Sequence, residues 1–254
     1  MVSGMRHSFR ERLLAGDTLL GTVVTLATAQ ASELLAQAGY DWLWIDMEHA
    51  PLDIATVQAL IVGAGSSCSP VVRVPANDDV WLKRVLDLGP EGVIIPHVDS
   101  VADAQAAVRA CRYPPRGTRS VGIGRAQSYG PGLIDYLATA HERVAIMPQI
   151  EHANAVAEIE EILAVEGVDC VVVGPFDLSA SLGHPGELDH PEVTQAIERV
   201  AEACREANKP AALFAGSVEF ATRWRKVGFD VLAVGADVTL LAASARSDLA
   251  RLRA

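Results

Sequence analysis

The chain has 254 residues, of which 50% are hydrophobic and 5% aromatic, and its formal net charge at pH 7 is −11. This length suits one large core, either a single α/β barrel or two smaller domains. An acidic chain without a basic run lacks the clustered lysine and arginine that nucleic acid or an acidic membrane surface requires, so we expect neither as a partner.

Export signals and cysteine pairs are also missing from the sequence. The first residues, MVSGMRHSFRERLLAG, are too charged to contain the apolar core of a signal peptide. No later apolar run reaches the roughly 20 residues that span a bilayer. The four cysteines form no C-x-x-C pair, which argues against a zinc site or a redox motif. We therefore expect a reduced, cytoplasmic protein.

Eight short β-branched runs alternate with stretches of helical spacing. The runs are GTVVTL (21–26), WLWID (42–46), VVRV (71–74), GVIIP (92–96), VAIMPQIE (144–151), CVVVGP (170–175), AALFA (211–215) and VLAVGAD (231–237). The helical stretches include 31–38, 80–88, 101–111, 153–163, 191–207 and 217–226. Because the strands are unbroken apolar runs, they are typical of a parallel sheet that helices cover on both faces.

Eight β-α units in this length favour closure into a (β/α)8 TIM barrel over an open doubly wound sheet. The first β-α turn lacks G-x-G-x-x-G, so a dinucleotide-binding fold has no support. We predict one barrel domain over residues 1–254, with the C-terminal helix a candidate for exchange with, or packing against, a neighbouring subunit. The long irregular segment 113–131 is interpreted as an active-site or subunit-contact loop.

Polar residues stand where several predicted strands end, and in such a barrel the active site is built at those ends. We expect these side chains to converge on one side of the barrel mouth. They are Asp46, Glu48 and His49 after the second strand, Arg73 on the third, Gln149 and Glu151 on the fifth, and Gly174, Pro175, Phe176 and Asp177 after the sixth.

The two carboxylates Glu151 and Asp177 are expected on neighbouring strands, without cysteine or histidine beside them. Such an oxygen-only pair suits Mg²⁺ or Mn²⁺ better than zinc, and leaves room for water and a chelating substrate. The alternative is that each carboxylate caps a helix or pairs with an arginine.

Three further residues each have a chemical and a structural interpretation. His49 is a candidate general base or a solvated loop histidine. Asp46 either orients a catalytic group or a water, or caps the next helix. Arg73, inside the apolar run PVVRVP, must find an anion or a carbonyl partner, which is either a developing enolate, a substrate carboxylate or Asp46 in a buried pair.

Lysine usage restricts the chemistry. Lys83, Lys209 and Lys226 are the only lysines, and all three fall in helical or loop stretches. A Schiff-base mechanism needs a lysine amine in the pocket, so carbonyl chemistry here would have to use a metal as the electron sink.

With these residues in view, the chain resembles the HpcH/HpaI family of class II, metal-dependent pyruvate aldolases, the 4-hydroxy-2-oxoheptanedioate and 2-dehydro-3-deoxyglucarate aldolase type. The resemblance covers nearly the whole chain. It rests on GYDWLWIDMEHAP (39–51), VVRVP (71–75), RYPPRGTRSVG (112–122), QIE (149–151), VEGVDCVVVGPFDLSASLG (165–183) and HPEV (190–193).

The resemblance implies a role for each candidate residue. Glu151 and Asp177 match the metal ligands, and His49 matches the base that accepts or returns a proton. Arg73 matches the arginine that holds the keto or enolate oxygen, with Asp46 as its polar neighbour.

Further expectations concern substrate, assembly and cofactor. Asp87, in VLDLG (85–89), matches an aspartate that pairs with the base across a subunit boundary. The resemblance also implies a homo-oligomer, a trimer or hexamer, and a divalent cation, Mg²⁺ or Mn²⁺ with Co²⁺ as a further candidate. The pyruvate unit would contact Arg73, Gln149, Gly174, Pro175, Phe176 and Asp177.

We therefore predict a carbon–carbon lyase that reversibly cleaves 4-hydroxy-2-oxo acids to pyruvate and an aldehyde through a metal-stabilised pyruvate enolate. One alternative is related enolpyruvate chemistry on the same site, such as oxaloacetate decarboxylation or a macrophomate-synthase type of reaction. Another is a non-catalytic metabolite-binding barrel.

Overall fold

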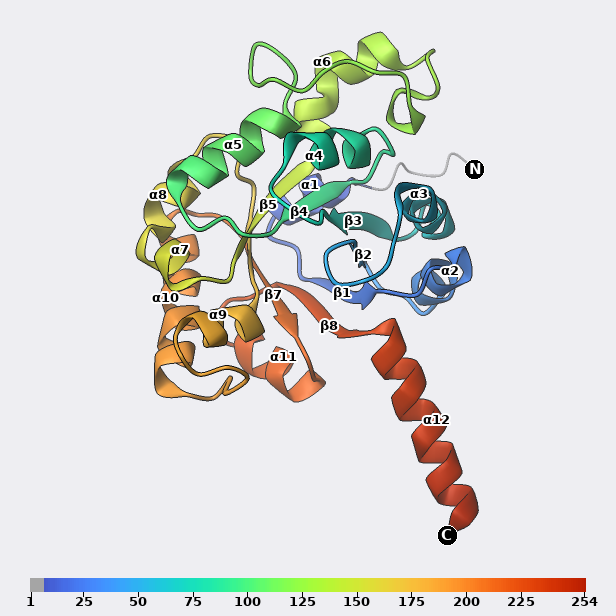
Figure 1. The fold of residues 1–254 in the computed structure, drawn as a ribbon, viewed down its shortest axis with the longest axis vertical. Coiled ribbons are helices and arrows are strands. Elements are labelled where there is room, and N and C mark those ends of the chain that lie inside the picture. Colours follow the sequence, from blue (N-terminus) through green and yellow to red (C-terminus); the bar gives the residue numbers. More distant parts are fainter. Residues whose placement is uncertain (1–6) are drawn as a thin grey trace.

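Eight parallel strands close into a barrel in sequence order, with β8 pairing back to β1. The computed structural model describes residues 7–254, so residues 1–6 of the stretch tested for a signal peptide lie outside the described part. The closed barrel with helices between its strands confirms the predicted (β/α)8 fold (Figure 1). The strands are β1 (Leu19–Val24), β2 (Trp42–Asp46), β3 (Ser69–Arg73), β4 (Gly92–Ile95), β5 (Ala145–Ile150), β6 (Val171–Val173), β7 (Ala211–Ala215) and β8 (Val231–Ala236).

Alternation along each strand divides the core into two layers. On β2, Trp42 and Trp44 belong to the cluster inside the barrel, whereas Leu43 and Ile45 pack with the surrounding helices. Successive side chains of a strand point to opposite faces, and both faces are covered here. This explains why the strands read as unbroken apolar runs in the sequence.

Most of the helices form a ring around the strands, whereas the last one projects away from the barrel (Figure 1). The helices are α1 (Phe9–Leu14), α2 (Ala29–Gln37), α3 (Ile54–Gly63), α4 (Asp79–Leu86), α5 (Val101–Cys111), α6 (Leu133–Arg143), α7 (Ala153–Ala157), α8 (Ile159–Ala164), α9 (Pro175–Ser181), α10 (Pro191–Glu206), α11 (Val218–Arg225) and α12 (Asp237–Arg253), with a 3-10 turn η1 (Arg125–Gln127).

Helix α1 precedes the first strand and closes the amino-terminal end of the barrel. Ser8 caps it through a reciprocal contact with Glu11. Phe9 and Leu13 are both 1% exposed and join the interior cluster, where the Phe9 ring lies 5.7 Å from the Trp42 ring. Burial of two large apolar side chains therefore seals the end of the barrel opposite the expected site.

The helix predicted over 153–163 is two helices, α7 and α8, separated at Glu158. Glu158 has φ −105° and ψ 22°, outside helical geometry, and its carboxylate accepts a hydrogen bond from Val101 N–H at 2.9 Å. Val101 begins α5, where an anion satisfies backbone donors that have no partner within the helix.

The long segment 113–131 connects α5 to α6 and therefore lies at the amino-terminal end of the barrel. In a (β/α)8 barrel, loops that lead from a helix to the next strand are at the end opposite the active site. Within one chain the segment is consequently remote from the C-terminal cavity.

The last helix, α12, leaves the barrel and runs away from it to the C-terminus (Figure 1). Its first residue, Asp237, is 6% exposed and accepts hydrogen bonds from Thr25 N–H, Thr25 Oγ1 and Leu26 N–H, which tie the helix to the end of β1. Further along, Leu241 and Leu252 are 63% and 84% exposed. Within residues 7–254 no helix combines the length and apolarity needed to cross a membrane.

Candidate active site

A cavity of about 390 Å³ opens at the C-terminal ends of the strands. Its apolar wall includes Trp44, Phe176 and Phe214. Most of the predicted site residues line it, namely Asp46, His49, Arg73, Gln149, Gly174, Pro175, Phe176 and Asp177. A concave apolar site with a few convergent polar groups is the usual form of a small-molecule pocket.

The centre of the polar wall is an ion-pair network around Arg73. Residues Asp46 and Arg73 are register partners on β2 and β3, so their side chains emerge side by side. Arg73 donates from Nε and Nη2 to the two oxygens of Asp46 at 2.9 and 2.7 Å, and its Nη1 lies 2.8 Å from Glu48 Oε2. Arg73 thus adopts the buried pair with Asp46 that the sequence left as one alternative.

The Arg73–Asp46 pair at the centre of this network is buried. Arg73 and Asp46 are 7% and 3% exposed, and the guanidinium lies over the Trp44 ring at 5.0 Å from its centroid. Nη1 also donates to Gln149 Oε1 at 3.4 Å. Removing one partner of such a buried pair typically costs about 3–5 kcal/mol, because the other charge is left uncompensated.

His49 lies at the rim with a freely accessible ring. Its backbone N–H donates to Asp46 Oδ1 at 3.4 Å, which ties the residue to the Arg73 network. The side chain is 64% exposed, lines the cavity, and approaches Glu48 Oε2 with Nε2 at 3.8 Å. A ring in this position can reach a substrate that enters the cavity.

Glu151 is buried beside the cavity, where Gly174 leaves space for it. A side chain on Gly174 would place its Cβ 3.2 Å from Glu151 Oε2 and 2.9 Å from Gln149 Nε2. Gln149 Nε2 donates to Glu151 Oε2, and His97 N–H donates to Oε1 at 2.8 Å. Burial raises the pKa of the Glu151 carboxyl, and the nearby Glu48 charge adds to the rise.

The carboxylate next to Glu151 is Glu48. One potential ligand atom each of Glu48, His97 and Glu151 lies within 4.8 Å of the other two. Asp177 is outside this set, at the start of α9, where it is exposed and lines the cavity. The predicted pairing of Glu151 with Asp177 therefore stays a prediction.

The negative charge of the carboxylates around Glu151 fits a divalent cation. Glu151 is buried and Glu48 is half-buried. Arg73, which contacts both Asp46 and Glu48, is the only lysine or arginine among the described residues that line the cavity. Neighbouring buried carboxylates repel each other unless a cation or a proton compensates them. A bound ion would remove the excess negative charge.

Asp87 lies at the opposite end of the barrel, at the C-terminal cap of α4. Arg119, which is 3% exposed, donates to its Oδ1 at 2.7 Å, and Gln127 donates to the same oxygen at 3.3 Å. The structure therefore does not bring Asp87 and His49 together within one chain. A contact between them would need a second copy, as the resemblance implied.

None of the three lysines and none of the four cysteines, all within the described residues, lines the cavity. Lys209, whose pKa is lowered by burial, donates from Nζ to the carbonyl oxygens of Leu163 and Val168. Burial also raises the pKa of the Cys111 and Cys204 thiols to about 12, which leaves them protonated and poorly nucleophilic at neutral pH.

Four residues at the site had no assigned role in the sequence analysis. Glu48 stands in the same cluster as Asp46 and was a strand-end candidate. His97 directly follows the fourth predicted strand, so its position alone would have made it a candidate for the active site. Trp44 and Phe214 lie inside strands, where an aromatic ring that faces the cavity cannot be told from core by sequence.

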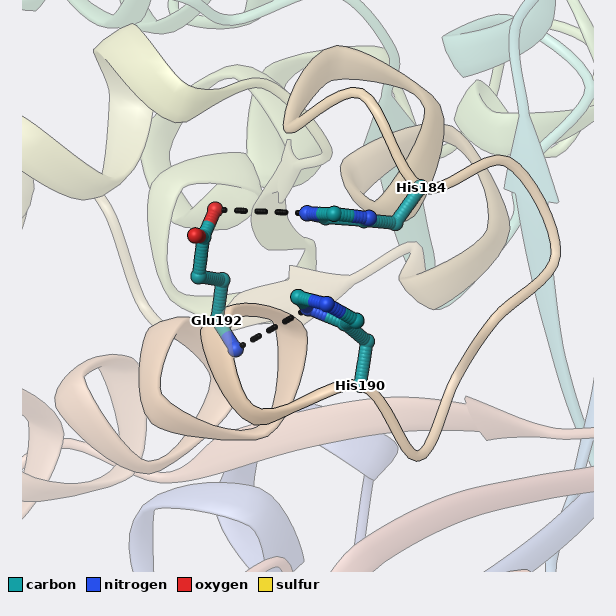
Figure 2. A group of neighbouring side chains, drawn as sticks. All are labelled: His184, His190 and Glu192. Atoms are coloured by element: carbon teal, nitrogen blue, oxygen red, sulfur yellow. Dashed lines mark hydrogen bonds and ion pairs between the residues drawn. The ribbon is translucent and has the colours of Figure 1, made fainter.

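A second cluster of histidines lies outside this cavity, before and within the first turn of α10 (Figure 2). His184 Nε2 lies 3.4 Å from Glu192 Oε2, and His190 Nδ1 accepts a hydrogen bond from Glu192 N–H. The two rings stack with centroids 3.4 Å apart and planes 19° from parallel. Since a lone pair lies in the plane of its ring, nearly parallel rings do not converge on one ion, and we interpret the cluster as the cap of α10.

The fold and the cavity define a barrel enzyme with its site at the C-terminal ends of the strands. The profile of the family described as HpcH/HpaI aldolase/citrate lyase matches residues 20–244. The chain belongs to this family, which confirms the resemblance seen in the sequence and the assignment as a carbon–carbon lyase.

Individual relatives match almost end to end. The chain is 41% identical over 249 residues to a hydroxypyruvate/pyruvate aldolase of Roseovarius nubinhibens, with 97% of each chain covered. It is 41% identical over 252 residues to a 4-hydroxy-2-oxo-heptane-1,7-dioate aldolase of Escherichia coli, covering 98% of this chain and 96% of the relative. The crystal structure of a family member from Burkholderia cenocepacia J2315 superposes with a TM-score of 0.92 at 41% identity, covering 96% of this chain and 98% of that one.

Proposed function

We propose that the protein is a metal-dependent aldolase that reversibly cleaves 4-hydroxy-2-oxo acids to pyruvate and an aldehyde. The observation that carries the proposal is the buried Arg73, fixed by Asp46 at the cavity wall with the His49 ring at the same rim. The relatives named as pyruvate and hydroxypyruvate aldolases support the same class of substrate.

Arg73 would stabilise the oxygen on which negative charge develops. Its Nε and Nη2 are taken by Asp46, and the Nη1 side faces Glu48 and Gln149. A guanidinium that is already oriented needs little rearrangement during the reaction, and such donors contribute most when they are held in advance. Asp46 therefore acts through Arg73 as a positioning residue.

His49 would move the proton. In the cleavage direction a base must remove the proton of the C4 hydroxyl, and in the condensation direction the same group returns it to the alkoxide oxygen. The exposed imidazole on the cavity rim has room to approach that hydroxyl, directly or through one water.

The metal would be held by Glu151 and Asp177, with Glu48 close by. Mg²⁺ or Mn²⁺ suits these oxygen donors, and Co²⁺ is a further candidate. When bound, the ion would supply a Lewis acid that polarises the keto group of the substrate. Gln149 and Gly174 would shape the space that the pyruvate unit occupies, with Pro175, Phe176 and Asp177 at its rim.

The apolar wall would receive the aldehyde portion. Phe176 is 47% exposed, and its ring lies 6.3 Å from the ring of Phe214, with Trp44 adjacent to Phe214 at 6.4 Å. An aromatic wall with the exposed Phe176 at its rim favours an aldehyde with an apolar or flat surface over a strongly charged one.

The assembly is proposed to be a homo-oligomer, a trimer or hexamer, formed in the cytoplasm. Exposed leucines along α12 and the exposed Ile123 and Tyr129 on the loop over Asp87 support contacts between copies. Exposed apolar side chains that gather on one element mark contact surfaces, whereas scattered ones do not. In such an assembly α12 would pack on, or exchange with, a neighbouring chain, and Asp87 would orient the neighbour's copy of His49.

A product assay tests the function directly. Purified enzyme with pyruvate, Mg²⁺ or Mn²⁺ and a panel of aldehydes should form 4-hydroxy-2-oxo acids, and cleavage of these acids should release pyruvate. A chelator should stop both directions, and added metal should restore them while circular dichroism and size stay unchanged. Full activity of demonstrably metal-free protein, or no product from any aldehyde, would contradict the proposal.

A further inference from the structure

His97 is an unassigned histidine at the C-terminal end of β4, held in an uncommon backbone conformation. Its φ is 53°, in the left-handed region that residues other than glycine seldom adopt. Such strained positions gather at functional sites, where surrounding contacts hold them in place. Here the backbone N–H donates to Glu151 Oε1 at 2.8 Å, so the conformation is coupled to the buried carboxylate.

The imidazole of His97 lies between two carboxylates. Nδ1 is 3.6 Å from Glu151 Oε1, and Nε2 is 3.2 Å from Glu48 Oε1. The other oxygen of Glu48 pairs with Arg73 Nη1 at 2.8 Å. One continuous chain of contacts therefore runs from Glu151 through His97 and Glu48 to the guanidinium at the cavity wall.

The spacing suits a metal ligand with a carboxylate partner. Two ligand atoms about 2.1 Å from one ion lie roughly 3.0 Å apart at a right angle and roughly 3.4 Å apart at the tetrahedral angle. The Nδ1 to Glu151 Oε1 separation of 3.6 Å is close to this range. A histidine that ligates through one nitrogen usually donates the other N–H to a carboxylate, and Glu48 Oε1 occupies that position.

We infer that His97 is a nitrogen ligand of the divalent ion held by Glu151, oriented by Glu48, and that it makes the site select Co²⁺ or Zn²⁺ over Mg²⁺. The inference rests on the proposed function, since it concerns the same ion. Replacing an oxygen-only set by one that contains imidazole favours later first-row metals, whereas Mg²⁺ prefers oxygen ligands and water. The side chain is 67% exposed, so an ion can reach it.

Metal binding by the full-length, metal-stripped protein tests this selectivity without turnover. Co²⁺ binding is followed by its visible absorption, and Co²⁺, Zn²⁺ and Mg²⁺ affinities are measured by calorimetry. His97→Gly removes the ring and suits the positive φ, and His97→Asn keeps a polar side chain that tolerates it. Both variants should bind Co²⁺ and Zn²⁺ at least about tenfold more weakly than the unchanged protein does, and their Mg²⁺ affinity should change by less than about threefold. Both should also alter the absorption spectrum of bound Co²⁺.

Two controls separate the possible failures. His184→Ala removes a ring with a comparable carboxylate contact, 3.4 Å to Glu192, outside the cavity, and should bind all three ions as the unchanged protein does. Glu151→Gln should lose all three ions. If Glu151→Gln loses them but both His97 variants keep the original Co²⁺ to Mg²⁺ affinity ratio and spectrum, His97 is not a ligand and the proposed metal site stands. No binding by the unchanged protein would overturn both.

Discussion

Replacing Arg73 by lysine keeps the positive charge but removes the planar guanidinium. In the structure the guanidinium makes two hydrogen bonds to Asp46, at 2.9 and 2.7 Å, and a third contact, to Glu48, at 2.8 Å. An ammonium on a flexible chain cannot reproduce this planar arrangement. We therefore expect Arg73→Lys to fold, to lose stability and to lose turnover.

The magnitudes follow from burial and from the charge-assisted bonds. Losing one hydrogen bond between buried charged groups should lower the free energy of unfolding by about 1.5–3 kcal/mol. Losing a donor that stabilises developing negative charge should lower kcat by about 10²–10³-fold, with a smaller effect on KM. Pyruvate release from a 4-hydroxy-2-oxo acid gives the kinetics, and thermal unfolding gives the stability.

Arg10→Lys is the matched control. Arg10 also donates two hydrogen bonds to one aspartate, from Nε and Nη2 to Oδ1 of Asp169 at 3.0 and 2.7 Å, at the amino-terminal end of the barrel. It should cost stability without lowering kcat. If Arg73→Lys raised KM and left kcat unchanged, Arg73 would be a binding clamp, and its role in stabilising the enolate oxygen would be wrong.

Three other predictions concern the carboxylate, the base and the lysines. Because folding raises the Glu151 pKa, ionisation of this carboxyl lowers the stability of the metal-free protein as pH rises from about 4 through the raised value. The Glu151→Gln variant lacks this ionisation, so in the presence of chelator its melting temperature should exceed that of the unchanged protein by an amount that grows from pH 4 to pH 7. A difference that stays constant over this range would contradict the prediction. His49→Ala should impair aldol cleavage more than oxaloacetate decarboxylation, which removes no hydroxyl proton, and equal losses would make His49 a positioning residue. Pyruvate with borohydride should leave the protein mass unchanged, whereas an adduct on Lys83, Lys209 or Lys226 would show a Schiff base and exclude the metal mechanism.

The barrel and the position of its site were predictable because they follow from periodicity. An apolar run such as VVV at 171–173 is typical of a strand buried on both faces, and eight such runs at this spacing favour closure into a barrel, which the structure has. Polar residues at strand ends then had to meet, as Asp46 and Arg73 do through their register. Helix α1 was not predicted, since six residues with two buried apolar positions carry little periodic signal.

The partners within the site were harder to predict, because they depend on side-chain direction. Glu151 was expected to bind an ion together with Asp177, which stays a prediction; the contacts of its oxygens with His97 N–H and Gln149 Nε2 were not foreseen. Strand order alone does not decide which neighbour a long side chain turns to. The resemblance implied that Asp87 pairs with the base His49. Within one chain this pairing cannot form, because Asp87 lies at the C-terminal end of α4 and therefore at the amino-terminal end of the barrel.

Trp44 gives the cavity an intrinsic optical reporter. Its indole lines the cavity under the Arg73 guanidinium, and its Nε1 has no hydrogen-bond partner among the described residues. Indole emission is sensitive to nearby charge. An anion that binds in the cavity and pairs with Arg73 should therefore change the tryptophan fluorescence of the unlabelled enzyme. Ligand and metal titrations can then be followed at equilibrium, with a Trp44→Phe variant separating this signal from that of Trp42, Trp81 and Trp224.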